Sequence, residues 1–108
     1  MIITKNSKIY ISGHQGLVGS SILRNLKKKG YKNLIIKSHN QLELESQLKT
    51  LNFFLENKPE VVFMAAAKVG GINANNTYPA DFLMKNIQIQ TNIFQSAIST
   101  GVKKLFFL

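Results

Sequence analysis

Three glycines spaced three residues apart are the first feature of this 108-residue sequence that could do chemistry. They belong to the stretch Gly13-His14-Gln15-Gly16-Leu17-Val18-Gly19. This G-x-x-G-x-x-G pattern is a close variant of the glycine-rich motif that binds the pyrophosphate of a dinucleotide. Gly13 permits a sharp turn, Gly16 leaves room for a phosphate beside the backbone, and Gly19 lets a following helix pack closely. We predict that all seven residues line a phosphate-binding turn; the alternative is a purely structural turn.

A second set of polar residues follows about 20 positions later, where an acidic side chain would accept the ribose 2′-hydroxyl of NAD. The sequence has Lys37 and His39 there, and no acid. Basic residues at this position accommodate the 2′-phosphate of NADP. We therefore expect NADP(H), with NAD(H) as the weaker alternative. The other interpretation is that Lys37 and His39 are simply exposed at the end of a strand.

A segment of small residues, glycines and asparagines comes directly after the apolar run Val61-Val62-Phe63-Met64. It reads AAAKVGGINANNTYP and covers residues 65–79. Open parallel sheets bind ligands beyond the carboxyl ends of their strands, so small residues here predict a backbone that passes close to a ligand. The alternative is a flexible connecting loop.

The elements that must position these residues follow from periodicity. Short apolar runs predict strands over residues 8–12, 33–37, 60–64 and 104–108. Apolar residues at helical spacing, with capping and breaking residues at the ends, predict helices over 17–29, 46–57 and 79–100. In the third helix the expected apolar stripe comprises Leu83, Ile87, Phe94, Ala97 and Ile98.

The alternation of strand and helix predicts the α/β class, with a Rossmann-type doubly wound parallel sheet. Numbered along the chain, its strands are expected in the order 3-2-1-4. The glycine turn would then lie in the crevice between the first and fourth strands. The fourth strand is expected to be truncated, so the sheet would be only the first part of such a fold.

Composition narrows the function classes. The chain has no cysteine, and no run approaches the ~18 apolar residues of a membrane span. The net charge of +9 comes from 14 basic and 5 acidic residues that are mostly dispersed. We interpret it as a solvated basic surface rather than a nucleic-acid interface, although a basic nucleic-acid binder is one alternative. We expect a cytoplasmic protein with no membrane, nucleic-acid or metal partner.

Taken together, the motifs resemble the amino-terminal part of the GDP-L-fucose synthase family, within the extended short-chain dehydrogenases/reductases. The likeness runs from about residue 8 to 108 and rests on three stretches: GHQGLVGS at 13–20, AAAKVGGI at 65–72 and NNTYPADF at 75–82. The glycine motif is shared by the whole superfamily. The other two stretches together are far more specific.

The resemblance implies an NADPH-dependent, two-step reaction that epimerises GDP-4-keto-6-deoxy-D-mannose and then reduces its ketone to give GDP-L-fucose. It also implies a homodimer. By resemblance, four further residues belong to the cofactor side: Ala65, Ala66, Ala67 and Leu108. Four belong to a loop on the nucleotide-sugar side: Lys68, Gly70, Gly71 and Asn76. Lys68 could equally be a phosphate contact or a solvated charge.

Several departures from the family limit what is expected of this chain. By resemblance, relatives supply a Tyr-x-x-x-Lys pair for the reduction and a Cys for the epimerisation. None of the three tyrosines here has a lysine four positions later, and the chain has no cysteine. We therefore expect no catalytic residue within residues 1–108, which would form an incomplete NAD(P)-binding domain whose catalytic and substrate-binding remainder is absent. His39 stands where relatives usually have arginine, and Glu43 and Ser46 replace the usual residues after the second strand. The alternatives are a non-catalytic dinucleotide-binding module, or another extended short-chain enzyme acting on a nucleotide sugar.

Overall fold

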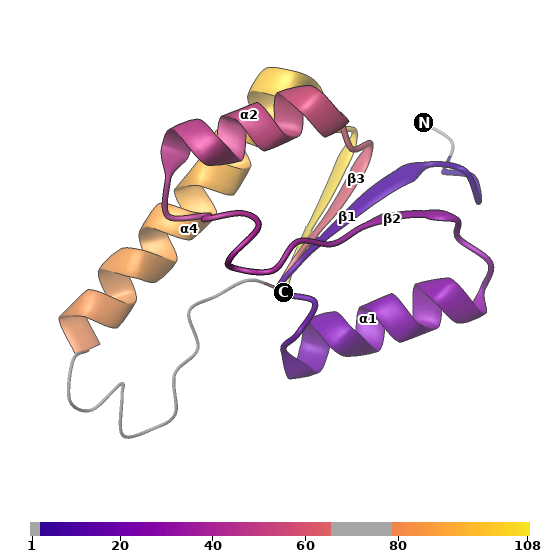
Figure 1. Ribbon diagram of the computed structural model, residues 1–108, viewed down its shortest axis with the longest axis horizontal. Coiled ribbons are helices and arrows are strands. Elements are labelled where there is room, and N and C mark those ends of the chain that lie inside the picture. The colour runs from indigo at the N-terminus through magenta and orange to yellow at the C-terminus, as the bar shows by residue number, and fades with distance from the viewer. Residues whose placement is uncertain (1–2, 66–78) are drawn as a thin grey trace.

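A computed structural model of the chain describes residues 3–65 and 79–108. Strands and helices alternate along the chain (Figure 1). In order they are β1 (Lys8–Ser12), α1 (Leu17–Lys28), β2 (Asn33–Ile35), α2 (Gln47–Asn57), β3 (Val61–Met64), α4 (Pro79–Thr100) and β4 (Lys104–Phe107). Every predicted element is present, and the predicted boundaries differ from these by at most two residues. The largest difference is in β2, which ends at Ile35 and not at residue 37 as predicted.

All strand pairs are parallel, which confirms the predicted α/β class. The order of the strands is β2-β1-β3-β4, so the predicted order 3-2-1-4 is wrong. After β2 the chain returns through α2 to the other side of β1. The reversal, and with it the crevice at the carboxyl ends, therefore lies between β1 and β3 and not between the first and fourth strands.

The apolar content of the strands explains this order. All residues of β1 after the first are buried, as are three of the four in β3, and these two strands pair at the centre of the sheet. In β2, by contrast, Asn33 is exposed and the other two residues are only half-buried. A short strand with little to bury is suited to the edge of a parallel sheet rather than to its interior.

Helices cover both faces of the sheet. Figure 1 shows α1 on one face and α2 with α4 on the other. On the α1 face, Ile9, Ile11 and Val61 form a core cluster. Partly buried residues that pack against it include Ile22 and Leu26 of α1.

The face under α2 and α4 holds the larger core cluster. Its centre is Tyr10, whose ring centroid lies 4.6 Å from that of Phe53 and 5.8 Å from that of Phe54. Burial disfavours the charged phenolate and raises the pKa of the Tyr10 hydroxyl above its ordinary value. This aromatic cluster fixes α2 on the sheet.

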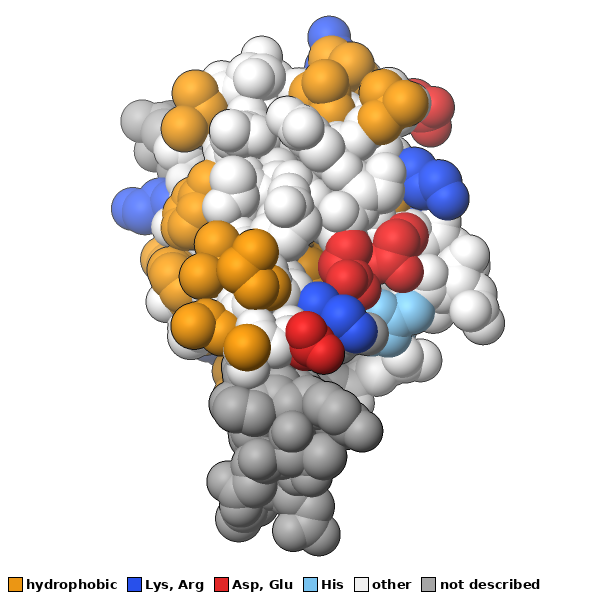
Figure 2. All heavy atoms as spheres, turned by 90° about the vertical axis from the view of Figure 1, so that its left-hand side faces the viewer, with side chains coloured by type: hydrophobic (Ala, Val, Ile, Leu, Met, Phe, Trp, Pro, Cys, Tyr) orange, Lys and Arg blue, Asp and Glu red, His pale blue; other side chains and the backbone are white. Residues whose placement is uncertain are grey.

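The apolar stripe of α4 differs from the predicted one. Ile89, Ile93 and Ala97, spaced four residues apart, are its buried apolar residues, and Phe94 is partly buried beside them. Of the predicted stripe, three residues are exposed instead: Leu83, Ile87 and Ile98. Figure 2 shows hydrophobic side chains gathered on the side of the molecule that α2 and α4 form. The helix is apolar on more than one face, and the expected stripe mixed the buried face with an exposed one.

Local signals end and begin the helices as expected. Ser46 caps α2, its hydroxyl oxygen accepting a hydrogen bond from the backbone N–H of Lys49 at 3.2 Å.

Over residues 3–65 and 79–108, none of the helices is both long enough and apolar enough to span a membrane.

Candidate functional site

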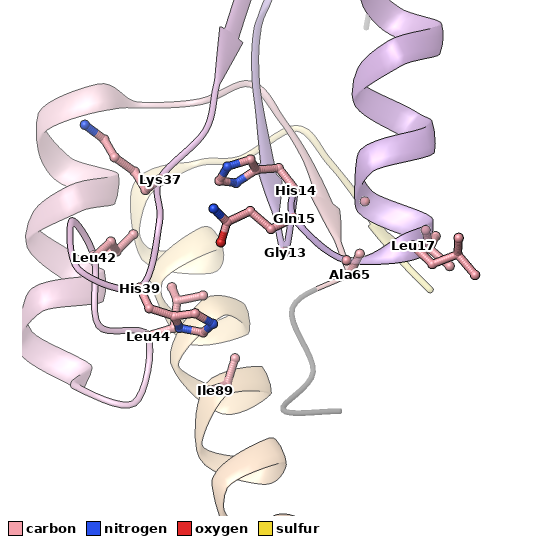
Figure 3. Close-up of a pocket in the computed structure, with 13 residues that line it drawn as sticks. Gly13, His14, Gln15, Leu17, Lys37, His39, Leu42, Leu44, Ala65 and Ile89 are labelled. Atoms are coloured by element: carbon pink, nitrogen blue, oxygen red, sulfur yellow. The ribbon is translucent and has the colours of Figure 1, made fainter. Parts of the chain in front are cut away.

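A cavity of about 480 Å³ opens at the carboxyl ends of β1 and β3 (Figure 3). Among the described residues, five parts of the chain form it: the turn between β1 and α1, the start of α1, the segment between β2 and α2, the residue after β3, and α4. Its lining residues are Gly13, His14, Gln15, Gly16, Leu17, Val18, Gly19, Lys37, His39, Leu42, Leu44, Ala65 and Ile89. The structure thus brings together segments that are up to 76 positions apart in the sequence, from Gly13 to Ile89.

The glycine turn is built by backbone hydrogen bonds. Gly13 has a φ of 77°, in the left-handed region where a side chain is strained, so glycine is required there. The N–H of Gly16 donates to the carbonyl oxygen of Gly13 at 3.0 Å, and the N–H of Ser20 donates to that of Gly16 at 2.9 Å. The chain therefore turns sharply out of β1 and enters α1 within four residues.

The other two glycines of the motif have different roles in the fold. A Cβ at Gly19 would clash with the Gly13 carbonyl group, so the close approach of α1 to the turn requires glycine. At Gly16 the nearest atom to such a Cβ is the Gly13 oxygen at 3.5 Å, an ordinary contact. The backbone of Gly16, with φ −78° and ψ 173°, is also open to any residue. Within the described chain, nothing in the fold demands glycine at position 16.

Gly16 is also the N-cap residue of α1, and no side chain from residues 3–65 or 79–108 caps this end of the helix. The first turn of α1 contains no acidic residue. Uncapped N–H groups and the positive end of the helix dipole attract anions, phosphate groups above all. This end of the pocket can therefore bind a phosphate through the backbone alone.

The opposite side of the pocket is basic. His14 and Gln15 extend from the glycine turn toward the segment that carries Lys37 and His39 (Figure 3). His14 and Lys37 are half-buried and His39 is exposed. Among the described residues that line the pocket, none is acidic. A pocket with this lining favours a ligand that carries negative charge at both ends.

The apolar wall of the pocket was not predicted from the sequence. Leu42, Leu44 and Ile89 line the cavity and are only 7%, 6% and 3% exposed. All three also belong to the core cluster around Tyr10. A flat apolar group, such as a nucleobase, could lie against this wall. The signal for it was present: in Gln41 to Ser46 the two leucines alternate with two glutamates, which is the period of an extended segment with one buried face.

Ten of the thirteen predicted cofactor residues are found here. The seven residues of the glycine turn, Lys37, His39 and Ala65 line the cavity. Leu17 does so mainly with its backbone, because its side chain is 88% exposed and points away from the other labelled residues (Figure 3). Leu108 is not a lining residue; it follows β4, and its N–H donates to the carbonyl oxygen of Met64 at 3.2 Å.

Other predicted residues cannot be placed. Six of them lie outside the described residues: Ala66, Ala67, Lys68, Gly70, Gly71 and Asn76. Among the residues that the structure does describe, no group of three or more His, Cys, Asp or Glu side chains could hold a metal ion.

A family model described as the NAD dependent epimerase/dehydratase family matches residues 9–108 of the chain. Among curated proteins, the chain is 54% identical over 107 residues to "Putative GDP-L-fucose synthase 2" of Arabidopsis thaliana, covering 99% of this chain and 33% of the relative. It is 44% identical over 101 residues to the GDP-L-fucose synthase of Escherichia coli K12, covering 94% and 32%. The chain therefore spans about a third of the length of these relatives.

Solved structures are also similar to this chain over about a third of their length. A GDP-mannoheptose C4 reductase from Campylobacter jejuni, solved with NADP bound, superposes with a TM-score of 0.93 at 42% identity, covering 98% of this chain and 31% of that one. A structure described as DdhaC superposes with a TM-score of 0.95 at 54% identity, covering 98% and 30%.

Proposed function

The chain belongs to the NAD dependent epimerase/dehydratase family, and from this premise we propose that its pocket is the NADP(H) site of an enzyme that makes GDP-L-fucose. The reaction is the epimerisation of GDP-4-keto-6-deoxy-D-mannose followed by reduction of its ketone, in the cytoplasm. When bound, the cofactor supplies the hydride for the reduction. Residues 1–108 contribute the cofactor-binding part, and the groups that act on the sugar belong to the remainder of the relatives' length.

The observation that carries this proposal is the glycine at position 16. The fold has room for a Cβ there and imposes no special backbone conformation. A ligand lying against the uncapped start of α1 does need that room. The pyrophosphate of a dinucleotide is such a ligand, because it can accept hydrogen bonds from N–H groups of the first turn of the helix.

The rest of the lining fits the adenosine half of the cofactor. Leu42, Leu44 and Ile89 supply an apolar surface for the base. Lys37 and His39, on the same side of the pocket, supply positive charge for a 2′-phosphate. A carboxylate that would accept a free ribose 2′-hydroxyl is missing from the lining residues. This combination favours NADP(H) over NAD(H).

Ala65 is where the nicotinamide half would pass, since it follows β3 and its N–H donates to the carbonyl oxygen of Ser12 at 3.1 Å. Its small side chain leaves the carboxyl ends of β1 and β3 open. The curated relatives named GDP-L-fucose synthase and the NADP-bound reductase support both the cofactor and the nucleotide-sugar substrate.

Titration of the chain with NADPH and with NADH, followed by fluorescence, tests the proposal. We expect NADPH to bind more tightly. The variant Gly16→Val should retain the circular dichroism spectrum of the folded chain and lose binding, because its branched side chain occupies the path of the pyrophosphate. Ser21→Val, which adds the same side chain elsewhere in α1, should bind as the native chain does. Failure of the native chain to bind either dinucleotide, or unchanged binding by Gly16→Val, contradicts the proposal.

We also propose that the enzyme is a homodimer that pairs through the side formed by α2 and α4. Exposed apolar side chains gather there (Figure 2). They are Leu48 and Leu55 of α2, and Leu83, Met84, Ile87 and Ile98 of α4. Two antiparallel or crossed helix pairs from two copies would bury these residues against one another.

A further inference from the structure

The segment between β2 and α2, residues 36–46, forms one wall of the pocket without belonging to a strand or a helix. It contributes Lys37, His39, Leu42 and Leu44 to the lining. A wall made of turns keeps its shape only if other parts of the chain hold it. Besides the burial of Leu42 and Leu44 in the core, one contact that does so is made at the backbone carbonyl group of Leu44.

This carbonyl oxygen accepts two buried hydrogen bonds. Asn92 of α4 donates its side-chain Nδ2–H to the Leu44 oxygen at 2.8 Å. The hydroxyl of Thr50 in α2 has a single proton, which it shares between the Ser46 oxygen at 2.7 Å and, in a longer contact, the Leu44 oxygen at 3.4 Å. The shorter bond to Leu44 therefore comes from Asn92, across 48 positions of sequence.

Asn92 is an unusual residue for its place. It is 0% exposed and lies on the buried face of α4, next to Ile93, which is likewise 0% exposed. Burying an amide is unfavourable unless its hydrogen bonds are satisfied. Its Oδ1 accepts a hydrogen bond from Nε2 of Gln88, one turn earlier, at 2.7 Å. That bond leaves the Nδ2 group to face Leu44.

The position of Asn92 along α4 links it to the pocket. Ile89, three residues earlier on the same helix, is itself a lining residue of the cavity. In Figure 3 Ile89 and the segment with His39 and Leu44 lie on the same side of the cavity. The helix thus supplies one part of the apolar wall directly and holds the other part through Asn92.

We propose that Asn92 is a positioning residue for the adenosine half of the cofactor. By holding the Leu44 carbonyl group to α4, it fixes the wall formed by Leu42, Leu44 and Ile89 and the adjoining turn that carries His39. This role rests on the proposed function of the pocket. The pyrophosphate end, built by the glycine turn and α1, is independent of it.

The test compares Asn92→Leu with a matched control, Ile93→Val. Leucine has the same number and branching of side-chain heavy atoms as asparagine but neither donates nor accepts a hydrogen bond. The control weakens the same buried face of α4 and removes no bond to Leu44. Because Asn92→Leu can also lower stability, Gln88→Ala provides a milder variant. Gln88 is exposed, and its loss frees the orientation of the Asn92 amide without opening the core.

Three probes separate positioning from general destabilisation: NADPH, adenosine 2′,5′-bisphosphate and inorganic pyrophosphate. Under conditions in which each variant is folded, Asn92→Leu should weaken binding of the first two by about five- to tenfold, the effect of losing one buried hydrogen bond. Pyrophosphate binding should not change. Gln88→Ala should show the same pattern with a smaller effect, and Ile93→Val should bind all three probes as the native chain does.

Amide hydrogen exchange supplies a measurement that needs no ligand. The N–H groups of Gln41 and Leu42, which donate to the Ser38 oxygen, should exchange faster in Asn92→Leu and not in Ile93→Val. Equal effects of the two variants on all probes and on exchange would overturn the proposal for Asn92. If the native chain binds no dinucleotide, the proposed function fails instead, and the exchange result alone decides whether Asn92 holds the wall.

Discussion

Gly19 packs directly on the backbone of Gly13: a Cβ at position 19 would lie 2.6 Å from the Gly13 carbonyl carbon and closer still to its oxygen. At Gly16, in the same turn, the nearest atom is 3.5 Å away. One glycine of the motif is therefore needed by the fold, and the other is available to a ligand. The two positions should respond differently to the same substitution.

Gly19→Ala should lower the free energy of unfolding by at least about 2 kcal/mol, since the clash is with backbone that can relieve it only by moving α1 away from the turn. Gly16→Ala should change it by less than about 1 kcal/mol, because its φ and its surroundings accept a side chain. Urea unfolding of the two variants measures the difference. Equal destabilisation would show that Gly16 is structural.

The second prediction concerns cofactor preference. His39→Arg should raise the ratio of NADPH to NADH affinity by about tenfold, because a guanidinium group binds phosphate with two parallel hydrogen bonds. His39→Asp should lower the ratio, since a carboxylate repels the 2′-phosphate and accepts a free 2′-hydroxyl. Fluorescence titration with both cofactors measures the ratio.

Asn40→Asp is the matched control for charge, because it adds a carboxylate to the next residue, which is exposed and does not line the pocket. It should have a much smaller effect than His39→Asp, and one that added salt largely removes. If the two aspartates act alike, the charge of the segment rather than contact with the ligand sets the preference.

The third prediction follows from Tyr10. Its pKa is raised by burial above the ordinary 10.0, so the folded chain holds this group neutral where the unfolded chain ionises it. The corresponding stability is fully present below about pH 10 and is lost as pH rises further, by about 1.4 kcal/mol per pH unit. Tyr10→Phe keeps the ring contacts and removes this loss. Urea unfolding at pH 8 and 11 should show a native chain that loses about 1.4 kcal/mol relative to the variant.

The fourth prediction concerns association. Ile98→Asp should shift the chain toward the monomer in sedimentation experiments, because residue 98 is 81% exposed and lies on the proposed dimer side. Asn25→Asp, on the exposed surface of α1, changes the net charge by the same amount and should leave the association state as it is. A native chain that is monomeric at all concentrations contradicts the proposed pairing for these residues.

Local patterns predicted the elements of this fold well, because they depend on neighbouring residues. The second helix was predicted to begin at Ser46, and in the structure Ser46 is the N-cap of α2. The strand order depends instead on which strands bury most, a comparison between distant segments. It could have been read from the exposed Asn33 at the start of β2 and the buried run Val61–Met64, but the usual order of the fold class was used in its place.

The same distinction holds for the pocket. Its polar residues were predicted, since glycine spacing and the basic pair after β2 are local signals. Ile89 was missed because nothing in the sequence says which face of α4 turns toward the sheet. Asn92 was missed for a related reason: an asparagine is ordinary in sequence, and only its burial and its bond to Leu44 distinguish it.

Leu42, Leu44 and Ile89 serve the hydrophobic core and the pocket wall at once. In evolutionary terms, every substitution at these positions is selected both for packing of the core and for the shape of the pocket wall. The proposed surface for the base therefore cannot change without affecting stability. Lys37 and His39 lie outside the core clusters and carry no such double constraint. Substitutions at these two positions can therefore change the preference between NADP(H) and NAD(H), while the apolar surface proposed for the base stays fixed.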